Sequence, residues 1–406
     1  MRRSVSISLV LVSVLFLSSC SDNDMVFVSL NTTSVPRIVI EPDDGRGPIL
    51  DAIAGATNNI RLTIYELTDL QSVPQTPAAP ATSVVQGLID KARQGVNVRV
   101  IVDQNRYTNV PQVQQTVQAL RTAGVIVNLS SAAFCYTHQK TFVIDGPTTA
   151  NPGLSGMTII MSLNLMPGYF STTRDYAVIT RDPGVAKEVS IVFDSDFTLV
   201  GPPTPCSYAH SPATTTPPPS SADTPTVSEA TLLWSPVNSK AKLFQLIGAA
   251  KQSLVITTEE LTDPDTVCLI RSVARSAGKP SVQILLSGDT GSNAPAVKTL
   301  LGLGLSNLSI RVMPGQPSPP NPATIQTPLY MHGKQVIVDG VQAFVGSENL
   351  TNTSLIQNRE LGTLFTDSGM IARLQSVFTS DFSTPGNSLP AQACTGGQGC
   401  YTVTCP

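Results

Sequence analysis

The sequence has 406 residues, 25 Lys and Arg against 28 Asp and Glu, and a formal net charge of −3. This length indicates one large domain or two to three ordinary ones, and the near-neutral charge argues against a strongly basic nucleic-acid scaffold. Hydrophobic residues make up 41% of the chain, which excludes a chain that is disordered throughout. Only three histidines are present, which limits metal sites built from several histidines.

The first twenty residues have the pattern of an export signal. Arg2 and Arg3 precede a mostly apolar stretch over 5–17, which is too short to span a bilayer comfortably. The stretch ends in Leu-Ser-Ser-Cys at Cys20 and resembles the lipobox of bacterial lipoproteins, which implies cleavage before Cys20 and its lipidation. A plain secretory signal is the alternative. We expect a signal peptide over 1–19 and a tether over 20–35. The protein is then expected to be a lipoprotein of the cell envelope (outer membrane or periplasmic face) or a secreted protein.

The remainder of the chain is a tandem repeat. A Pro/Thr/Ser-rich segment over 201–228 separates the copies and has the composition of an extended linker. We therefore predict two related domains, over 36–200 and 229–384, followed by a Cys-containing tail over 385–406. The blocks that recur in the same order are 64–69 with 258–263, 138–145 with 332–339, 162–164 with 347–349, 174–175 with 359–360, and 192–197 with 377–382.

The hydrophobic pattern of each copy predicts alternating helices and strands. In the first copy the predicted elements are helix 50–56, strand 60–65, helix 84–94, strand 96–102, strand 141–144 and strand 158–161. In the second copy they are helix 243–250 and strands 254–258, 282–286, 335–338 and 343–345. This alternation indicates layered α/β domains.

Setting Cys20 aside leaves an even number of cysteines, which in an oxidising compartment favours disulfides. The sequence does not decide their pairing. A metal site made of Cys394, Cys400 and Cys405 is the alternative, but their spacing is not of the Cys-x-x-Cys kind and no His lies nearby. The six residues are Cys135, Cys206, Cys268, Cys394, Cys400 and Cys405.

The motif His-x-Lys-x-x-x-x-Asp occurs in both copies, and Ser-x-Asn and a further carboxylate follow it each time. With these residues the chain resembles the phospholipase D superfamily over about 36–382. The resemblance implies two tandem phospholipase D-like α/β/α sandwich domains that form a pseudo-two-fold bilobal unit with one shared site. The residues are His138, Lys140, Asp145, Ser162, Asn164 and Asp175, and then His332, Lys334, Asp339, Ser347, Asn349 and Glu360.

These residue types suit a phosphodiester. On a strand the residues i and i+2 share a face, so each His would lie beside its Lys, which neutralises phosphate oxygens. The Ser and Asn side chains of each Ser-x-Asn can donate hydrogen bonds to the same oxygens. A carboxylate such as Glu360 can accept from an imidazole N–H. Asp145 and Asp339 lie an odd number of positions from their histidines, so we expect them in a structural ion pair or a turn. Glu66 and Glu260 are candidates for the edge of the site or for a buried structural contact.

The resemblance implies a two-step reaction through a phosphohistidine, with no metal or other cofactor. By analogy with relatives that carry two motifs, His138 is the nucleophile and His332 is the acid and base. The first copy departs from the family pattern, because Met161 replaces the usual Gly before Ser162 and Asp175 replaces Glu. These departures put the symmetry of the site in doubt.

The expected function is a phospholipase D-type phosphodiesterase that hydrolyses glycerophospholipid head groups. The expected partners are a phospholipid substrate and the membrane, reached through the lipid anchor, and the chain is expected to be a monomer. A transphosphatidylase related to cardiolipin or phosphatidylserine synthases is an alternative. A nuclease-type phosphodiesterase is another, although the mild acidity and the lack of basic clusters make nucleic acid a poor partner. A surface lipoprotein that only binds phosphorylated ligands is the non-enzymatic alternative.

Overall fold

The computed structural model describes residues 36–70, 82–130, 133–199, 206, 231–315, 328–397 and 399–405. The predicted signal peptide, the tether with Cys20, and the linker over 201–228 apart from Cys206 lie outside the described residues. Within the described part of the chain, no helix is both long enough and apolar enough to cross a membrane.

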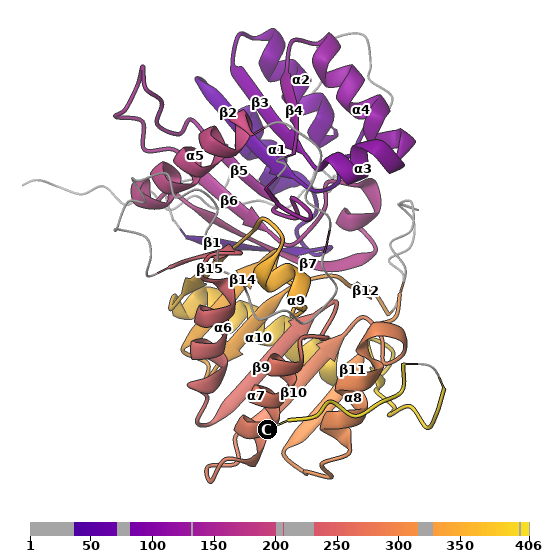
Figure 1. The fold of residues 1–406 in the computed structure, drawn as a ribbon. Helices are drawn as coiled ribbons and strands as arrows, with labels where there is room; N and C mark the ends of the chain where they lie inside the picture. The colour runs from indigo at the N-terminus through magenta and orange to yellow at the C-terminus, as the bar shows by residue number, and fades with distance from the viewer. Residues whose placement is uncertain are drawn as a thin grey trace, which may run out of the picture. The chain divides into compact units, whose positions relative to one another are not determined.

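The first half of the chain forms one mixed sheet with helices on it (Figure 1). Its elements are β1 (Arg37–Glu41), α1 (Gly47–Ala54), β2 (Asn59–Ile64), α2 (Val84–Arg93), β3 (Asn97–Val102), α3 (Gln104–Asn109), α4 (Pro111–Thr122), β4 (Ile126–Leu129), β5 (Thr141–Ile144), β6 (Met157–Met161), the 3-10 helix η1 (Pro167–Phe170), β7 (Thr173–Thr180) and α5 (Pro183–Thr198). The strand order is β1-β7-β6-β5-β2-β3-β4. β2, β3 and β4 pair in parallel, and the other pairs of this path are antiparallel.

The second half repeats this sheet strand for strand. Its elements are β8 (Leu232–Ser235), α6 (Ser239–Gly248), β9 (Ser253–Thr258), α7 (Pro264–Arg275), β10 (Ser281–Leu286), η2 (Gly291–Asn293), α8 (Ala294–Leu301), β11 (Leu308–Val312), β12 (Tyr330–Met331), β13 (Gln335–Val338), β14 (Gln342–Gly346), α9 (Asn352–Ile356), β15 (Glu360–Phe365), α10 (Ser368–Ser383) and β16 (Leu389–Pro390). The order is β8-β15-β14-β13-β9-β10-β11, with β16 added at the far edge. The short strand β12 leaves this sheet and pairs with β7 of the first half. The α/β fold built from two related domains is therefore confirmed.

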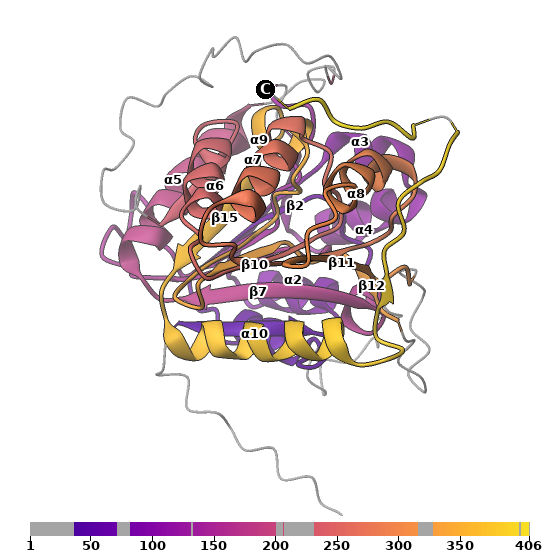
Figure 2. The ribbon, with the colours of Figure 1, turned by 90° about the horizontal axis from the view of Figure 1, so that it is seen from below.

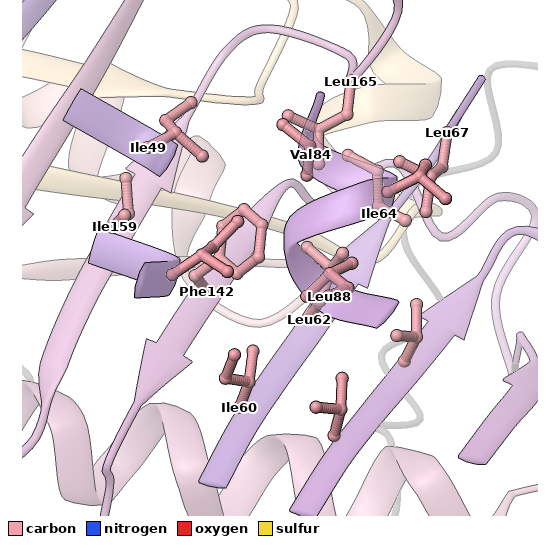
Figure 3. Packing of buried hydrophobic residues seen from close by; sticks show 14 of the residues in the cluster. Ile49, Ile60, Leu62, Ile64, Leu67, Val84, Leu88, Phe142, Ile159 and Leu165 are labelled. Atoms are coloured by element: carbon pink, nitrogen blue, oxygen red, sulfur yellow. The ribbon is translucent and has the colours of Figure 1, made fainter. Parts of the chain in front are cut away.

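Apolar side chains from one face of β2, together with the helices that cover this face, build the first core. α1 contributes Ile49 and α2 contributes Val84 and Leu88, which pack over Ile60 of β2 and Phe142 of β5 (Figure 3). β2 is buried over its whole length, as expected for a strand covered on both faces. The second half has an equivalent core between β9 and the helices α6, α7 and α8.

The long helices α5 and α10 each pack on strands of both halves. The α10 residues Ile371 and Phe378 belong to one core with Ile38 of β1 and Ile337 of β13. Figure 2 shows the α10 ribbon lying along the edge of the first sheet, next to β1. In the same way, α5 packs on β6 and on the second-half strand β8, where Trp234 Nε1 donates to Glu188 of α5 at 2.7 Å. Because these helices complete both cores, the described halves share one continuous interface.

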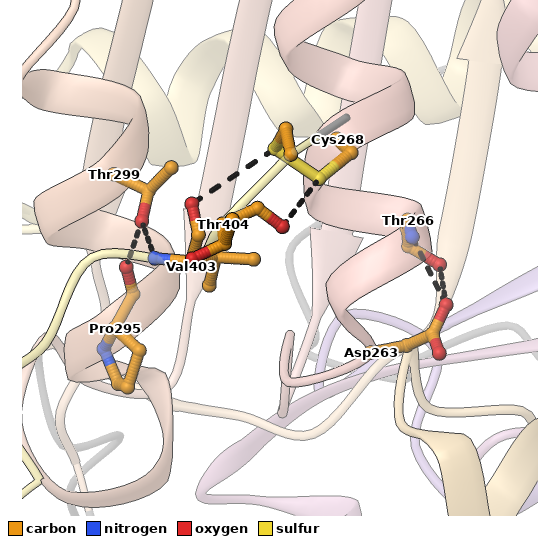
Figure 4. The surroundings of a disulfide bond; sticks show 8 residues. Asp263, Thr266, Cys268, Pro295, Thr299, Val403 and Thr404 are labelled. Atoms are coloured by element: carbon orange, nitrogen blue, oxygen red, sulfur yellow. Dashed lines mark hydrogen bonds between the residues drawn. A yellow bond between two sulfur atoms is a disulfide. The ribbon is translucent and has the colours of Figure 1, made fainter. Parts of the chain in front are cut away.

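All six cysteines outside the signal region form disulfides. The pairs are Cys135–Cys206, Cys268–Cys405 and Cys394–Cys400. The alternative of a metal site made of Cys394, Cys400 and Cys405 is therefore wrong, because none of the three keeps a free thiol. The bond from Cys268 holds the C-terminal tail against α7 and α8, where Val403 N donates to Thr299 Oγ1 at 2.7 Å (Figure 4).

Candidate active site

The two His-x-Lys segments are attached to the opposite half of the chain. His138 N and Gln139 N both donate to the carbonyl of Arg359, at 2.9 and 2.8 Å. His332 N and Gly333 N donate to the carbonyl of Arg174, at 3.3 and 2.7 Å. The segments lie just before β5 and β13 and not within a strand, so the expected strand geometry is wrong at these residues. The crosswise bonds, which the sequence does not reveal, fix both segments where the halves meet.

The carboxylates that orient the histidines also come from the opposite half. His138 Nδ1 donates to Glu360, at 3.0 and 2.8 Å from its two oxygens. His332 Nδ1 donates to Asp175 Oδ1 at 2.8 Å. Since each carboxylate takes the Nδ1 proton, it leaves Nε2 of that ring for chemistry. Although the side chain of Asp175 is shorter than that of Glu360, it lies at the same distance, 2.8 Å, from the Nδ1 atom of its histidine.

Each orienting carboxylate is itself held by buried donors. Glu360 Oε1 accepts from Ser354 Oγ at 2.7 Å and from Asn358 Nδ2 at 3.0 Å. Asp175 accepts from Ser162 Oγ at 2.7 Å and from Thr173 Oγ1 at 2.6 Å. Such support fixes the carboxylate and therefore the imidazole that it orients.

The two motif serines make buried hydrogen bonds to the strands that carry the orienting carboxylates. Ser162 Oγ binds Asp175 and also accepts from Tyr176 N at 2.9 Å. Ser347 Oγ accepts from Leu361 N at 3.1 Å. Both side chains are fully buried. These bonds tie each serine to the strand that carries Asp175 or Glu360, and contact of the two hydroxyls with a phosphate stays a prediction.

The two motif lysines are buried and lie beside the histidines. Lys140 Nζ donates to the carbonyl of His138 at 2.6 Å, and Lys334 Nζ donates to the carbonyl of His332. Lys140 is fully buried and Lys334 is 1% exposed. Burial lowers the pKa of Lys140 to about 7, an effect that Glu360 opposes and Lys334 reinforces. The ammonium groups are thus placed at the histidines with little water around them.

The electrostatics of the first half favour a neutral imidazole. Burial lowers the pKa of His138 to about 4, although Glu360 opposes this shift. Burial also raises the pKa of Glu360, but His138 and Lys140 outweigh it and hold that pKa below its ordinary value. His138 is therefore a neutral base near pH 7, with a charged carboxylate on Nδ1.

The sequence reasoning missed several residues of the site. Glu259 accepts hydrogen bonds from Lys334 Nζ and Asn349 Nδ2, both at 3.2 Å. On the other side, the ring of Tyr65 lies 4.7 Å from the ring of His138, edge to face. Both residues fall in the first recurring block, directly after a strand, and that position was the signal available in the sequence. The other motif asparagine, Asn164, is 3% exposed.

Asp145 and Asp339 close turns outside the histidine pair. Asp145 accepts from the backbone N–H groups of residues 57–59 at 2.6 to 3.1 Å. Asp339 does the same with residues 251–253, at 2.7 to 3.1 Å. Both have positive φ, 50° and 55°, which Asp tolerates better than most residues. Their bonds are those of the turn role, and neither carboxylate is a described partner of a histidine.

The other carboxylates considered at the sequence level lie beside the site. Glu66 is paired with Arg106, whose guanidinium lies 5.3 Å from the centroid of the Tyr65 ring. Glu260 accepts from Ser292 Oγ at 3.2 Å. Both are therefore engaged in structural contacts at the edge of the histidine pair.

Two further ion pairs join the halves and carry the site strands. Arg174 pairs with Asp381 of α10 at 2.7 Å, and Arg359 pairs with Asp196 of α5 at 2.8 Å. These arginines are the residues whose carbonyls hold the histidine segments. All four residues of these ion pairs lie in recurring blocks of the sequence, which contain the residues without indicating how they pair.

The comparisons with known proteins agree with this arrangement. A family model described as "Cardiolipin synthase, PLD-like domain" matches residues 49–197 and again residues 243–382. Phosphatidylserine synthase of Haemophilus influenzae Rd KW20 is similar in structure, with a TM-score of 0.59 and 13% identity over 88% of each chain. Polyphosphate kinase of Porphyromonas gingivalis has a TM-score of 0.58 and 12% identity over 91% of this chain and 53% of its own, so this chain spans about half of it. At these identities the likeness concerns the fold alone. The comparison with curated proteins gave no match.

Proposed function

This chain belongs to the phospholipase D superfamily, since the family model matches both of its halves, and we propose that it hydrolyses phosphodiesters of glycerophospholipid head groups. Superfamily members act on phosphodiesters, as hydrolases or as transferases. The observation that supports an active site is the reciprocal pairing of His138 with Glu360 and of His332 with Asp175. Each pair uses Nδ1 of the imidazole and leaves Nε2 for chemistry, which is what supports a reaction at both histidines.

The proposed reaction has two steps. Nε2 of His138 attacks phosphorus, and the bond to the leaving oxygen breaks as that oxygen takes the Nε2 proton of His332. His332 then removes a proton from water, which attacks the phosphohistidine and releases the phosphoryl group. Lys140, Lys334, Asn164 and Asn349 would stabilise the charge on the non-bridging oxygens. No step of this scheme calls for a metal or another cofactor.

The test is a panel of purified variants against phosphatidylcholine, phosphatidylethanolamine and phosphatidylglycerol vesicles and bis(p-nitrophenyl) phosphate, with EDTA present. We expect His138→Ala and His332→Ala each to lower kcat by at least about 1000-fold, as when a member of a catalytic unit is lost. His210→Ala is the matched control, because His210 lies in the predicted linker and in no motif. Full activity in either motif variant would refute the proposal, and so would loss of the wild-type activity with EDTA.

Transfer to an alcohol is the second candidate, because the family description and the phosphatidylserine synthase structure both point to transferases. In that reaction an alcohol replaces water in the second step. Glycerol, serine and phosphatidylglycerol added to the vesicle assay would give new phospholipids at the expense of phosphatidic acid. If phosphatidic acid is the sole product at every alcohol concentration, transfer is excluded and hydrolysis is the reaction.

We also propose that the chain acts at the cell envelope as a lipid-anchored monomer. The support is the export pattern with Cys20 and the internal pairing of two domains, which supplies both motifs from one chain. Metabolic labelling with palmitate should label the wild-type protein and should not label Cys20→Ser if Cys20 carries the anchor. Equal labelling of the two proteins would count against the anchor.

A further inference from the structure

Glu259 lies beside His332, at a position where the first half of the chain has a residue of a different type. Its Oε2 is 3.2 Å from Lys334 Nζ, 3.2 Å from Asn349 Nδ2 and 3.5 Å from His332 Nε2. Its Oε1 accepts from Tyr330 Oη at 2.6 Å. The carboxylate therefore binds the polar groups that surround the reactive nitrogen of His332.

The counterpart of Glu259 in the first half is Tyr65, the residue after β2. Its ring covers His138 edge-on, and Lys140 Nζ lies 5.2 Å from the ring centroid. In the described part of the chain, the one carboxylate paired with His138 is Glu360, on Nδ1. The two imidazoles thus have different surroundings: the ring of Tyr65 lies beside His138, and the Glu259 carboxylate lies 3.5 Å from Nε2 of His332.

The buried charges around the two histidines do not balance while both imidazoles are neutral. Three carboxylates, those of Glu360, Asp175 and Glu259, face two ammonium groups, those of Lys140 and Lys334. A positive charge on His332 restores the balance, because an imidazolium there can donate to Asp175 from Nδ1 and to Glu259 from Nε2. Unbalanced charge is costly in such buried surroundings, where His332 is 2% exposed.

We propose that Glu259 is a positioning residue that divides the two catalytic roles, because it holds His332 as the imidazolium and leaves His138 as the neutral nucleophile. The catalytic part of this inference rests on the proposed function. His332 then begins the first step with the Nε2 proton that the leaving oxygen needs, and His138 begins it with a free Nε2 electron pair. An anionic phosphodiester would take the place of the Glu259 carboxylate at Lys334, so the imidazolium would keep an anionic partner.

Other ionisable groups around His332 agree with this charge state. Burial raises the pKa of Glu259, but Lys334 and His332 outweigh it and hold that pKa below its ordinary value, so the carboxylate is charged. Burial raises the pKa of Glu41, which lies beside Asp175, to about 8, so Glu41 is neutral at pH 7 and adds no charge. The phenols of Tyr169 and Tyr330 also face the ring, and burial raises the pKa of both.

The scarcity of histidine makes the proposal directly measurable. Long-range 1H–15N spectra of the 15N-histidine-labelled, full-length protein, titrated without any ligand, would contain three imidazoles, and His138→Gln and His210→Gln assign them. We expect wild-type His332 to show the two protonated nitrogens of an imidazolium at least about one pH unit above the pH at which His138 becomes neutral. Glu259→Gln, which keeps the shape and removes the charge, should move the His332 midpoint down by about one pH unit or more. In the same spectra His138 should move by less than about 0.3 units, which shows that the variant is folded.

Glu260→Gln is the matched control, because it removes the neighbouring carboxylate, which binds Ser292 and not His332. An unmoved His332 in Glu259→Gln, or an equal shift in Glu260→Gln, would overturn the proposal. Tyr65→Glu is the converse variant and should raise the His138 midpoint; no rise in folded protein would also count against the proposal. The titrations need no turnover, so they separate a failure of this inference from a failure of the proposed function. An imidazolium at His332 in a protein without phosphodiesterase activity would refute only the latter.

Discussion

His138 is buried against Glu360, and its burial lowers its pKa to about 4, while burial lowers the pKa of Lys140 beside it to about 7. The two shifts act on the proposed reaction in opposite directions. His138 must be neutral to attack, so its active form is lost as the pH falls through about 4. Lys140 must be charged to stabilise the phosphoryl oxygens, so its active form is lost as the pH rises through about 7. His138 and Lys140 are therefore both in their active forms only between about pH 4 and about pH 7.

We predict a bell-shaped pH profile of kcat/KM with limbs near pH 4 and pH 7 for a soluble phosphodiester such as bis(p-nitrophenyl) phosphate. Lys140→Arg should move the basic limb upward, as far as the pH at which His332 loses its proton, because guanidinium keeps its charge at high pH. The acid limb should stay in place. A basic limb that does not move in this variant would show that Lys140 is not its origin.

The sequence identified the two histidines of the site but not the residues that lie beside them. The His-x-Lys motifs identified His138 and His332, but the residues beside them, Tyr65 and Glu259, belong to no His-x-Lys or Ser-x-Asn motif and contact the histidines only in the folded chain. Gly333 is similar, because a Cβ there would come within 2.4 Å of the Tyr176 ring. The need for glycine at that position is set by a strand of the other half.

At the scale of elements, the turns that lead into β2 and β9 are closed by the last residue of each motif. Asp145 and Asp339 accept three consecutive backbone N–H groups each, and the pKa of both carboxyls is held below its ordinary value. For both groups burial raises the pKa, and backbone hydrogen bonds outweigh it. Because these N–H groups belong to the approach to a strand, the aspartates stabilise the sheet and not the histidines.

We predict that Asp339→Asn and Asp145→Asn each lower the free energy of unfolding by about 1–2 kcal/mol, as for the loss of a charged cap, with kcat changed less than about threefold. Urea unfolding and steady-state kinetics measure the two effects. Asp265→Asn is the control, because Asp265 makes an exposed pair with Lys240, and a change below about 0.5 kcal/mol is expected. A large loss of kcat at unchanged stability would show instead that these aspartates take part in the reaction.

Over the whole molecule, the halves are joined by reciprocal contacts that also build the site. Arg174 with Asp381 and Arg359 with Asp196 cross between the halves, and the Arg359 guanidinium lies 4.2 Å from the centroid of the Phe134 ring. The same arginine carbonyls hold the histidine segments. Separation of the halves would therefore dismantle the site, and we expect both halves to unfold together.

We predict that Arg359→Met or Asp196→Asn lowers the free energy of unfolding by about 3–5 kcal/mol, because the partner is left as an uncompensated buried charge. Guanidinium unfolding followed by circular dichroism measures it. The Arg373–Asp44 pair also crosses between the halves, but Arg373 is 37% exposed in its side chain, so Arg373→Met should cost less than about 1 kcal/mol. Equal costs at the two pairs would contradict the buried role of Arg359.

Much of the fold was predictable because the relevant signals are local. Apolar runs with turn residues between them placed β5 and β13 at their observed bounds, and α2 begins at Val84, where Ser83 supplies the cap that the pattern lacked. The duplicated blocks announced two copies of one domain. They also contained Arg174, Asp196, Arg359 and Asp381 without indicating that these residues pair with the other copy.

The sequence by itself determined the α/β fold, the duplication and the chemical groups at the histidines, because periodicity and spacing follow from the chain's own geometry. Only the tertiary structure decided that Glu360 serves His138 and Asp175 serves His332, that the motif serines hold strands, and that Glu259 and Tyr65 make the two sides unequal. These are contacts between residues far apart in sequence, made across an interface between two copies. A repeated pattern is compatible with pairing within a copy or between copies, and the packing of α5 and α10 on both sheets selects the second.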